Sequence, residues 1–234
     1  MLILIDFISS AVYRIDRSRL KRDSSSRAGG TIETPFGPIV YRKLGAAEED
    51  PILIFRRFHD DPRPQAYAAR ALGGTRVISI VRDDVGVERP STPSNYIEFT
   101  SERPTTFFET IGTGYVQQDP PYCPELRQSL LAAGAGETGN LLVVDKPPAP
   151  DVRAWWQDHG VSLISVETQP EGALCRELEL RYAVLALPQT ARPDVLLPDI
   201  LAHLPTERGC GCDQLMATAR KFGKLTADWF ENLE

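Results

Sequence analysis

Short apolar runs alternate with helical patterns over most of this chain. Each nearly continuous apolar run predicts a buried strand, and these runs lie at 1–8, 51–55, 76–81, 140–144, 161–166 and 181–187. Apolar residues at helical spacing, several times followed by glycine, predict helices at 64–74, 124–134, 149–160, 170–180, 194–204 and 212–230. The turn TPFG separates two strand-like runs, 31–33 and 38–44, and therefore predicts a hairpin.

This order of elements predicts the fold class. Repeated strand–helix–strand units with nearly continuous apolar strands are typical of a partly parallel sheet that is covered by helices on both faces. We find no internal repeat and no linker, so we predict a single α/β domain over 1–234 with a central mixed sheet. The polar stretch 14–30 is interpreted as a long, mobile surface loop.

Composition narrows the classes of partner. Hydrophobic residues make up 42% of the 234 residues, which is enough for a full core. The net charge of −6 argues against a nucleic-acid-binding face. No apolar run is long enough to cross a bilayer, and the apolar start lacks the basic residues and cleavage site of a signal peptide. We therefore expect neither nucleic acid nor membrane as a partner, and a cytoplasmic location.

The cysteines offer one candidate for metal binding. Cys210 and Cys212 form the sequence CGC, a thiolate pair, but no second Cys or His pair lies at zinc spacing from it. We therefore expect no metal. A disulfide, a free thiol pair and a helix cap stay open as roles for CGC. The spacing of the four cysteines does not suggest a disulfide framework, which indicates a reducing compartment.

One histidine, His59, lies in a segment that also contains two arginines and two aspartates. His59 belongs to FRRFHDD (55–61), which leaves a predicted strand and brings arginines and acids to the place where α/β sheets usually have their crevice. A salt-bridged, solvated loop is the alternative. His159 and His203 fall late in predicted helices, where a cation favours the helix dipole. Neither GxxxxGK[ST] nor a GxGxxG after a strand occurs in the chain.

Five segments together carry a family resemblance. They are IETPFG (32–37), YIEFTSERPTTFF (96–108), PYCPELRQSLLAA (121–133), TQPEGALCRELELRYAVLAL (168–187) and LPTERGCGCDQLMATA (204–219). In this order they resemble the trimeric purine nucleoside phosphorylases, in particular the methylthioadenosine/methylthioinosine phosphorylase branch. The resemblance implies a nucleoside phosphorylase-like fold and a pentosyltransferase that cleaves the N-glycosidic bond of a purine nucleoside with phosphate.

The resemblance also implies a phosphate site, and here the chain departs from the family pattern. Where the family has G-G-S-G after its first strand, this chain has IDFISS, which leaves Ser9 and Ser10 as candidate donors. Where the family has A-R-H-G, FRRFHDD keeps Arg57 and supplies His59 one place late. The third phosphate-binding turn falls on Asp83 and Asp84, whose charges oppose an anion.

The remaining site residues follow from the same resemblance. The implied ribose and base contacts fall on Val166, Glu167, Thr168 and, from a neighbouring subunit, Tyr115. The family acid that serves purine N7 falls on Gln189 or Thr190, which are the candidate catalytic positions. Glutamine hydrogen-bonds a purine edge but cannot transfer a proton.

Three interpretations follow. The chain is a divergent enzyme that uses phosphate or water, or a degenerate structural or regulatory subunit that assembles with an active paralogue, or a nucleoside-binding sensor. The segments that match the family carry its hairpin, loop and core helices, whereas the altered segments hold phosphate, sugar and base. We expect no cofactor, phosphate as co-substrate, and either a homo-oligomer (trimer or hexamer) or a hetero-oligomer with a catalytic paralogue.

The loop at 96–108 is the best marker of the family. In the family it lies near the subunit contacts, so Thr100 and Arg103 are expected to order the loop and the interface. Phe107 and Phe108 are expected to bury apolar area, worth roughly 1.5–3 kcal/mol each if fully covered.

Overall fold

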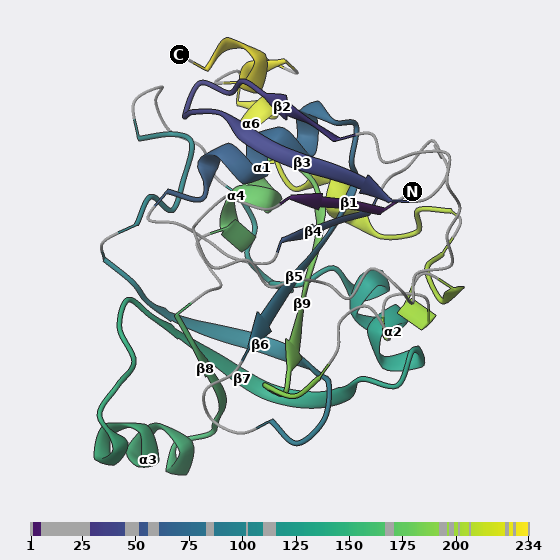
Figure 1. Ribbon diagram of the computed structural model, residues 1–234. Helices are drawn as coiled ribbons and strands as arrows, with labels where there is room; N and C mark the ends of the chain where they lie inside the picture. Colours follow the sequence, from purple (N-terminus) through teal and green to yellow (C-terminus); the bar gives the residue numbers. More distant parts are fainter. Residues whose placement is uncertain are drawn as a thin grey trace.

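The computed structural model describes residues 2–5, 29–44, 52–55, 61–82, 87–101, 103–109, 116–166, 171–191, 196, 199–200, 202–205, 207–222, 225–226 and 228–233. Its strands are β1 (Leu2–Ile5), β2 (Gly29–Ile32), β3 (Ile39–Leu44), β4 (Ile52–Phe55), β5 (Arg76–Arg82), β6 (Ser91–Phe99), β7 (Gly136–Val144), β8 (Val161–Ser165) and β9 (Arg181–Leu187). Within these residues the nine strands form one sheet, in the order β2-β3-β1-β4-β5-β9-β6-β7-β8 (Figure 1).

The sheet is mixed, as the sequence predicts. Strands β1, β4, β5 and β9 run parallel to one another. The β2–β3 hairpin adds to β1 in the antiparallel sense. On the other side, β6 pairs with β9 antiparallel, at Ser91 and Ala186, and β7 and β8 follow β6 in parallel. The polarity of the sheet therefore reverses between β9 and β6.

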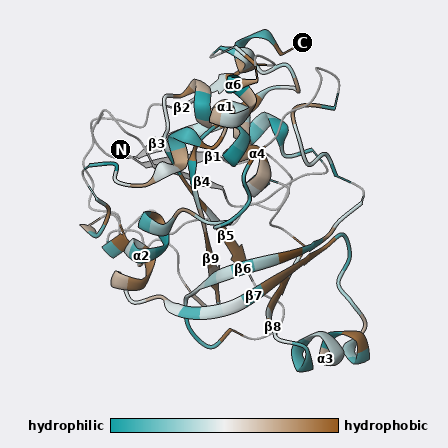
Figure 2. Cartoon of the chain, turned by 180° about the vertical axis from the view of Figure 1, so that it is seen from behind, coloured by the Kyte–Doolittle hydropathy of each residue, from teal (hydrophilic) through white to brown (hydrophobic). Residues whose placement is uncertain are grey.

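The two central strands are buried on both faces. Alternate residues of β5 and β9 enter different apolar clusters: Val77 and Val184 lie in one, Ile78 and Leu185 in the other. The first cluster is covered by α1 (Arg63–Ala71), α4 (Glu171–Glu177) and α6 (Ala217–Lys221), and the second by α2 (Pro124–Ala132). Figure 2 shows the hydrophobic character of β5 and β9. The sequences of β5 and β9 are nearly continuously apolar because helices cover both faces of the sheet at these strands.

Glycine ends the predicted helices as expected. Gly73, Gly134 and Gly160 follow α1, α2 and α3 (Pro150–Asp158) with φ values of 75°, 93° and 87°. These angles lie in the left-handed region that a residue without a side chain adopts at little cost. Helix α4 is shorter than predicted and ends before Glu179, a non-glycine residue at φ 58°.

Three sequence-based expectations need correction. The pattern at 212–230 predicted one helix, but the segment is divided into a 3-10 turn η1 (Gly211–Gln214), helix α6 and a second 3-10 turn η2 (Trp229–Asn232). The loop expected at 96–108 begins later, because 96–99 belong to strand β6. Of the loop predicted at 14–30, Gly29 and Gly30 form the start of β2, and the rest lies outside the described residues. The helix predicted at 194–204 also lies partly outside them.

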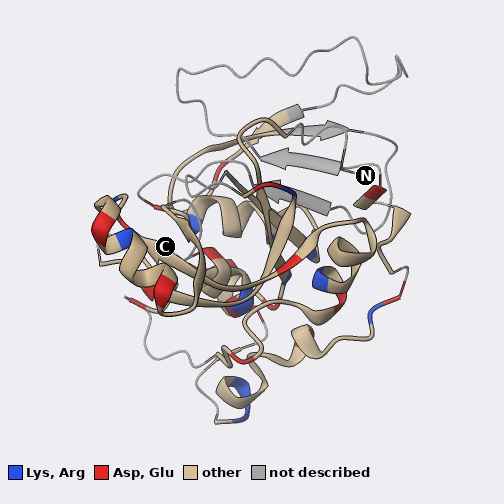
Figure 3. Ribbon diagram, turned by 90° about the horizontal axis from the view of Figure 1, so that it is seen from below, with Lys and Arg blue, Asp and Glu red and all other residues tan. Residues whose placement is uncertain are grey.

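The distribution of charged residues and the length of the helices bear on the partners expected from the composition. Acidic and basic residues are interspersed over the described elements (Figure 3). Among the described residues, no helix is both long and apolar enough to span a membrane.

Candidate functional site at the carboxyl ends of the parallel strands

Four parallel strands end at the same edge of the sheet. Ile5 of β1 is the register partner of Phe55 of β4, and Phe55 is the partner of Ser79 of β5. Ser79 in turn pairs with Val184 of β9. Strands β5 and β9 continue for three more residues, to the pair Arg82 and Leu187. Ligands of open α/β sheets bind at such carboxyl ends, near the point where the strand order reverses.

Most of the predicted site residues lie outside the described residues. This group contains Ser9, Arg57, His59, Tyr115, Glu167 and Thr168. The strands that precede three of them are described: Ile5 ends β1 before Ser9, and Phe55 ends β4 before Arg57 and His59. Their assignment to anion and sugar binding stays a prediction.

The two candidate catalytic positions stand in an exposed turn. Gln189 and Thr190 follow the last residue of β9 and are exposed. The turn is closed by a hydrogen bond from the Ala191 N–H to the Pro188 carbonyl oxygen, at 2.9 Å. Both side chains offer hydrogen bonds, and neither is an acid. The carboxyl end of β9 therefore presents neutral polar groups where the resemblance leads one to expect a proton donor.

A buried carboxyl group lies at the start of α4, next to the predicted ribose segment. Val166 is half-buried directly after β8, and Glu171, the first residue of α4, is fully buried. Burial, and then the nearby Glu171 charge, raise the pKa of the Tyr182 hydroxyl well above its ordinary value. The pKa of Tyr122 is also raised, mainly by burial. In the sequence, Glu171 belongs to the family-like segment 168–187, and only the fold buries it close to Tyr182.

The buried Glu177 carboxylate of α4 anchors the loop at 103–109 by hydrogen bonds. Both carboxylate oxygens of Glu177 accept hydrogen bonds, one from the Thr106 hydroxyl at 2.5 Å and one from the Phe107 N–H at 2.8 Å. Glu177 is 5% exposed. Burial raises the pKa of Glu177 to about 7, against the lowering effect of these two hydrogen bonds.

The same loop fills part of the core. Phe107 and Phe108 are buried, as predicted, with ring centroids 6.0 and 4.6 Å from that of Trp229 near the end of the chain. Phe107 also lies against Phe36 of the hairpin turn, at 5.6 Å. Arg103 lies 3.7 Å from the Asp145 carboxylate, which agrees with a role in ordering the loop.

Two histidines take the structural roles that their positions predict. The Nδ1 atom of His159 lies 2.7 Å from the Trp155 carbonyl oxygen, and its ring stacks on Trp155 with a centroid distance of 4.0 Å. The Nδ1 atom of His203 lies 2.7 Å from the Asp199 carbonyl oxygen. The His159 ring thus adds a second contact to a carbonyl oxygen that already accepts the His159 N–H, and the His203 ring lies against the Asp199 carbonyl oxygen in the same way, four residues back.

Three cysteines lie close together in the apolar cluster between α2 and the central strands β5 and β9. The Sγ atoms of Cys123, Cys210 and Cys212 all lie within 4.8 Å of one another. The hydrogen bond with Cys212 lowers the pKa of Cys123, and the same interaction raises the pKa of Cys212. Sequence spacing misses this group because Cys123 is far from CGC along the chain. The sequence feature that marks Cys123 is PYCP (121–124), which the family resemblance places at the start of a helix.

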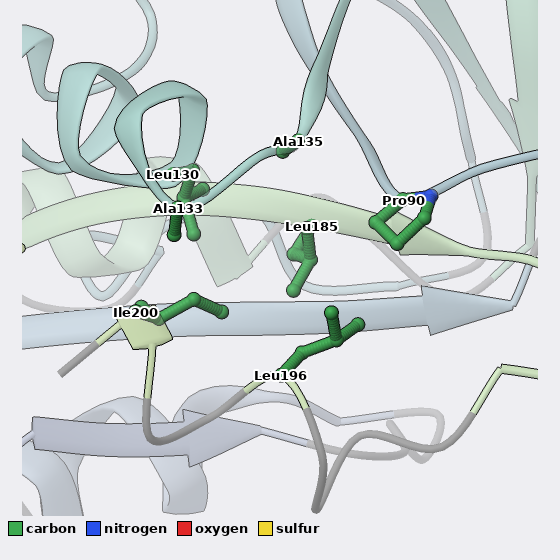
Figure 4. Close-up of a pocket in the computed structure, with 7 residues that line it drawn as sticks. All are labelled: Pro90, Leu130, Ala133, Ala135, Leu185, Leu196 and Ile200. Atoms are coloured by element: carbon green, nitrogen blue, oxygen red, sulfur yellow. The ribbon is translucent and has the colours of Figure 1, made fainter.

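A small hollow lies between α2 and β9. Its cavity volume is about 10 Å³, and Figure 4 shows that apolar side chains surround it. Its lining residues are Pro90, Leu130, Ala133, Ala135, Leu185, Leu196 and Ile200. Ligand pockets usually measure about 300 Å³ or more and carry polar groups that orient the ligand. This hollow is therefore a packing defect rather than a nucleoside site.

Comparisons with known proteins agree with this architecture. No protein-family model matches the chain. The chain is 30% identical to an S-methyl-5'-thioadenosine phosphorylase of Mycolicibacterium smegmatis over 175 residues, covering 67% of each protein. It is 27% identical to a probable S-methyl-5'-thioinosine phosphorylase of Methanopyrus kandleri over 237 residues, covering 81% of this chain and 91% of the relative.

A solved structure gives the same result for the fold. A methylthioadenosine phosphorylase from an antarctic soil metagenomic library superposes with a TM-score of 0.69 and 18% identity, covering 87% of this chain and 90% of the other. The fold is thus that of a nucleoside phosphorylase. The chain belongs to the purine nucleoside phosphorylase/methylthioadenosine phosphorylase family.

Proposed function

We propose that this protein binds a purine nucleoside at the carboxyl ends of β1, β4, β5 and β9 and cleaves its N-glycosidic bond. The supporting observation is the register of the strands. Since Ile5 pairs with Phe55, the segments that carry Ser9 and Arg57 start from adjacent strands, whose spacing is about 5 Å. Two segments far apart in sequence thus leave the sheet at one point, next to β5 and β9.

The proposed phosphate or water site uses the segments after β1 and β4. Arg57 and His59 supply positive or hydrogen-bonding groups, and Ser9 supplies a hydroxyl donor. The carboxylates of Asp83 and Asp84 follow β5 and weaken phosphate binding by charge repulsion, of the order of 1–4 kcal/mol for each unpaired carboxylate at contact distance. The same carboxylates suit water activation. Hydrolysis therefore competes with phosphorolysis in this proposal.

The proposed base contacts follow β9, and the proposed sugar contacts follow β8, which runs opposite to β9 in the sheet. Val166, Glu167 and Thr168 follow β8 and contact the ribose, with Tyr115 added from a neighbouring copy. Gln189 or Thr190 hydrogen-bonds the purine. Because neither residue transfers a proton, the leaving base is stabilised by hydrogen bonding alone, and we expect slow turnover.

A screen of nucleoside cleavage tests this function. Methylthioadenosine, adenosine, inosine and guanosine are incubated with the protein, with and without phosphate, and the released base is measured by liquid chromatography. Cleavage in phosphate alone indicates a phosphorylase, and equal cleavage without phosphate indicates a nucleosidase. If no base is released from any of the four under either condition, the proposal is wrong.

A variant that restores an acid makes the test sharper. General acid catalysis contributes about 10²–10⁴-fold, so Gln189→Asp is expected to raise kcat at least tenfold. Gln157→Asp makes the same chemical change on the exposed face of α3 and serves as the matched control. Equal rates for the two variants would remove Gln189 from the proposed mechanism.

A non-catalytic role is the second candidate, and the exposed turn at Gln189 and Thr190 favours it because it holds no acid. A subunit that completes an active paralogue would associate with a catalytic homologue during co-expression, which sizing and native mass measurement detect. A sensor would show nucleoside-dependent thermal stabilisation without consumption. Self-assembly alone and a flat melting curve would exclude both roles.

We also propose that the protein forms a homo-oligomer. Phe99 and Trp155 are 63% and 52% exposed, and Trp156 packs between them, with ring centroid distances of 5.5 Å to Phe99 and 5.0 Å to Trp155. Exposed apolar patches of this kind often mark interfaces between proteins. Light scattering of the purified chain tests this proposal: a trimer or hexamer is expected, and a monomer at micromolar concentration contradicts it.

A further inference from the structure

Three thiols from distant parts of the chain lie close enough to share one ion. Their Sγ atoms are within 4.8 Å of one another. Three sulfur atoms bound to one zinc ion at about 2.3 Å stand roughly 3.8 Å apart in tetrahedral geometry. The group therefore needs to contract by about 1 Å at most, which side-chain rotation can supply.

The backbone around the thiols is anchored on both sides. The Cys123 N–H donates a hydrogen bond to the Tyr182 carbonyl oxygen of β9, at 2.8 Å. The Gly209 N–H donates to the Glu125 carboxylate in the first turn of α2, which fastens the segment before CGC to the helix that Cys123 begins. A Cβ at Gly209 would stand 2.7 Å from the Glu125 Oε1 atom, so a larger residue there would displace this carboxylate from its contact.

Burial and charge favour a thiophilic cation of charge two. Cys123 is 0% and Cys212 is 5% exposed, whereas Cys210 is half-buried and leaves a path from solvent. A divalent ion with three thiolates carries one net negative charge. The Arg176 guanidinium, which is 3% exposed, donates hydrogen bonds to the neutral carbonyl oxygens of Gln117 and Pro121. Its positive charge also interacts with Cys123 and Cys212, so it offsets that negative charge.

We propose that Cys123, Cys210 and Cys212 bind one Zn²⁺ ion, with a water molecule in the fourth position on the side of Cys210. Thiolates are soft ligands and select zinc or copper(I) over magnesium and calcium. Copper(I) would leave two net negative charges in this buried place, which Arg176 alone does not offset. Binding releases the thiol protons and joins the turn η1 to the start of α2. The site is independent of nucleoside cleavage.

The full chain, purified with reductant and without oxygen, tests the site directly. Zinc titrated against a coloured competing chelator is expected to bind at one ion per chain. Cobalt(II) in its place is expected to give thiolate-to-metal charge-transfer bands and the intense red-region bands of a four-coordinate site. If the protein retains no zinc and shows no such cobalt spectrum, the proposal is wrong.

Cys123→Ser is the most informative variant. Serine is a preferred residue at a helix N-cap, the position of Cys123 in α2, so this variant is expected to fold. Zinc affinity is expected to fall more than roughly 100-fold, beyond what loss of an outer-shell partner costs. Cys175→Ala removes the remaining thiol, buried in α4, and is expected to bind zinc like the wild type. Unchanged affinity in Cys123→Ser would overturn the proposal.

A measurement on the unaltered protein separates binding from folding defects. Cys210, the half-buried thiol, is alkylated with iodoacetamide and followed by peptide mass measurement. At a zinc concentration 100 times the dissociation constant, its reaction is expected to slow about 100-fold, because only the metal-free fraction reacts. An alkylation rate that zinc does not change would likewise overturn the site.

Discussion

The buried carboxyl group of Glu177 should make the stability of this protein fall as the pH rises through neutrality. The pKa of Glu177 rises from 4.5 to about 7 on folding, chiefly because burial disfavours the ionised form. Between these two pH values the native state keeps a proton that the unfolded state releases. The unfolding free energy therefore decreases with rising pH in this window, and the loss is complete above pH 7.

The magnitude follows from the same pKa change. Each pH unit of difference is worth about 1.4 kcal/mol, so the total effect is about 3 kcal/mol and the part between pH 5 and pH 8 is about 2.5 kcal/mol. Glu177→Gln removes the titration but keeps the contacts. Its amide oxygen accepts from the Phe107 N–H, and its NH₂ group donates to the Thr106 hydroxyl oxygen.

Urea unfolding followed by tryptophan fluorescence at pH 5, 6, 7 and 8 measures this difference. Trp229 reports on the loop because its ring lies 4.6 Å from that of Phe108. Relative to Glu177→Gln, the wild type is expected to lose about 2.5 kcal/mol from pH 5 to pH 8, and other titrating groups cancel in the comparison. Glu177→Ala leaves the Phe107 N–H unpaired and is expected to be less stable at every pH. Parallel pH profiles for wild type and Glu177→Gln would refute the argument.

Two further predictions concern the helices. Glu179 has a φ angle of 58° and accepts hydrogen bonds from Arg220 at 2.6 and 2.8 Å. Glu179→Ala and Glu179→Gly both lose these hydrogen bonds, but only glycine adopts this φ angle at little cost. The glycine variant should therefore be about 1 kcal/mol more stable than the alanine variant in urea unfolding. The reverse order would mean that the angle is not strained. Leu130→Ala empties a fully buried position beside the hollow and should cost about 2–5 kcal/mol, against at most about 0.5 kcal/mol for the exposed Val152→Ala control. Similar melting temperatures for the two variants would show that α2 packs loosely on the sheet.

Local pattern was enough to predict the strands and helices that form the core. The apolar runs at 76–81 and 181–187 correspond to β5 and β9, and both are buried on two faces because helices cover each side. The family resemblance also predicted the burial of Phe107 and Phe108. In each case, neighbours in sequence carry the signal, either as hydrophobic period or as a motif.

Local pattern failed where a distant partner decides the conformation. The helical pattern at 212–230 is broken because Glu179 accepts a hydrogen bond from the Met216 N–H just before α6, and because Trp229 packs on the loop at Phe108. Strand β6 lacks a clean alternation, yet its pairing with β7 over most of its length holds it in the sheet. Propensity is a weak signal beside such tertiary contacts.

The amino-acid sequence by itself determined the α/β class, the order of the core elements and, by resemblance, the family, because these depend on short-range hydrophobic period and on motifs. Only the tertiary structure decided that Cys123 joins Cys210 and Cys212, that Glu177 holds the loop at Thr106, and that β1 and β4 end side by side. These are contacts between residues far apart in the chain. Their energy comes from burial and from hydrogen bonds that exist only after folding has brought the partners together.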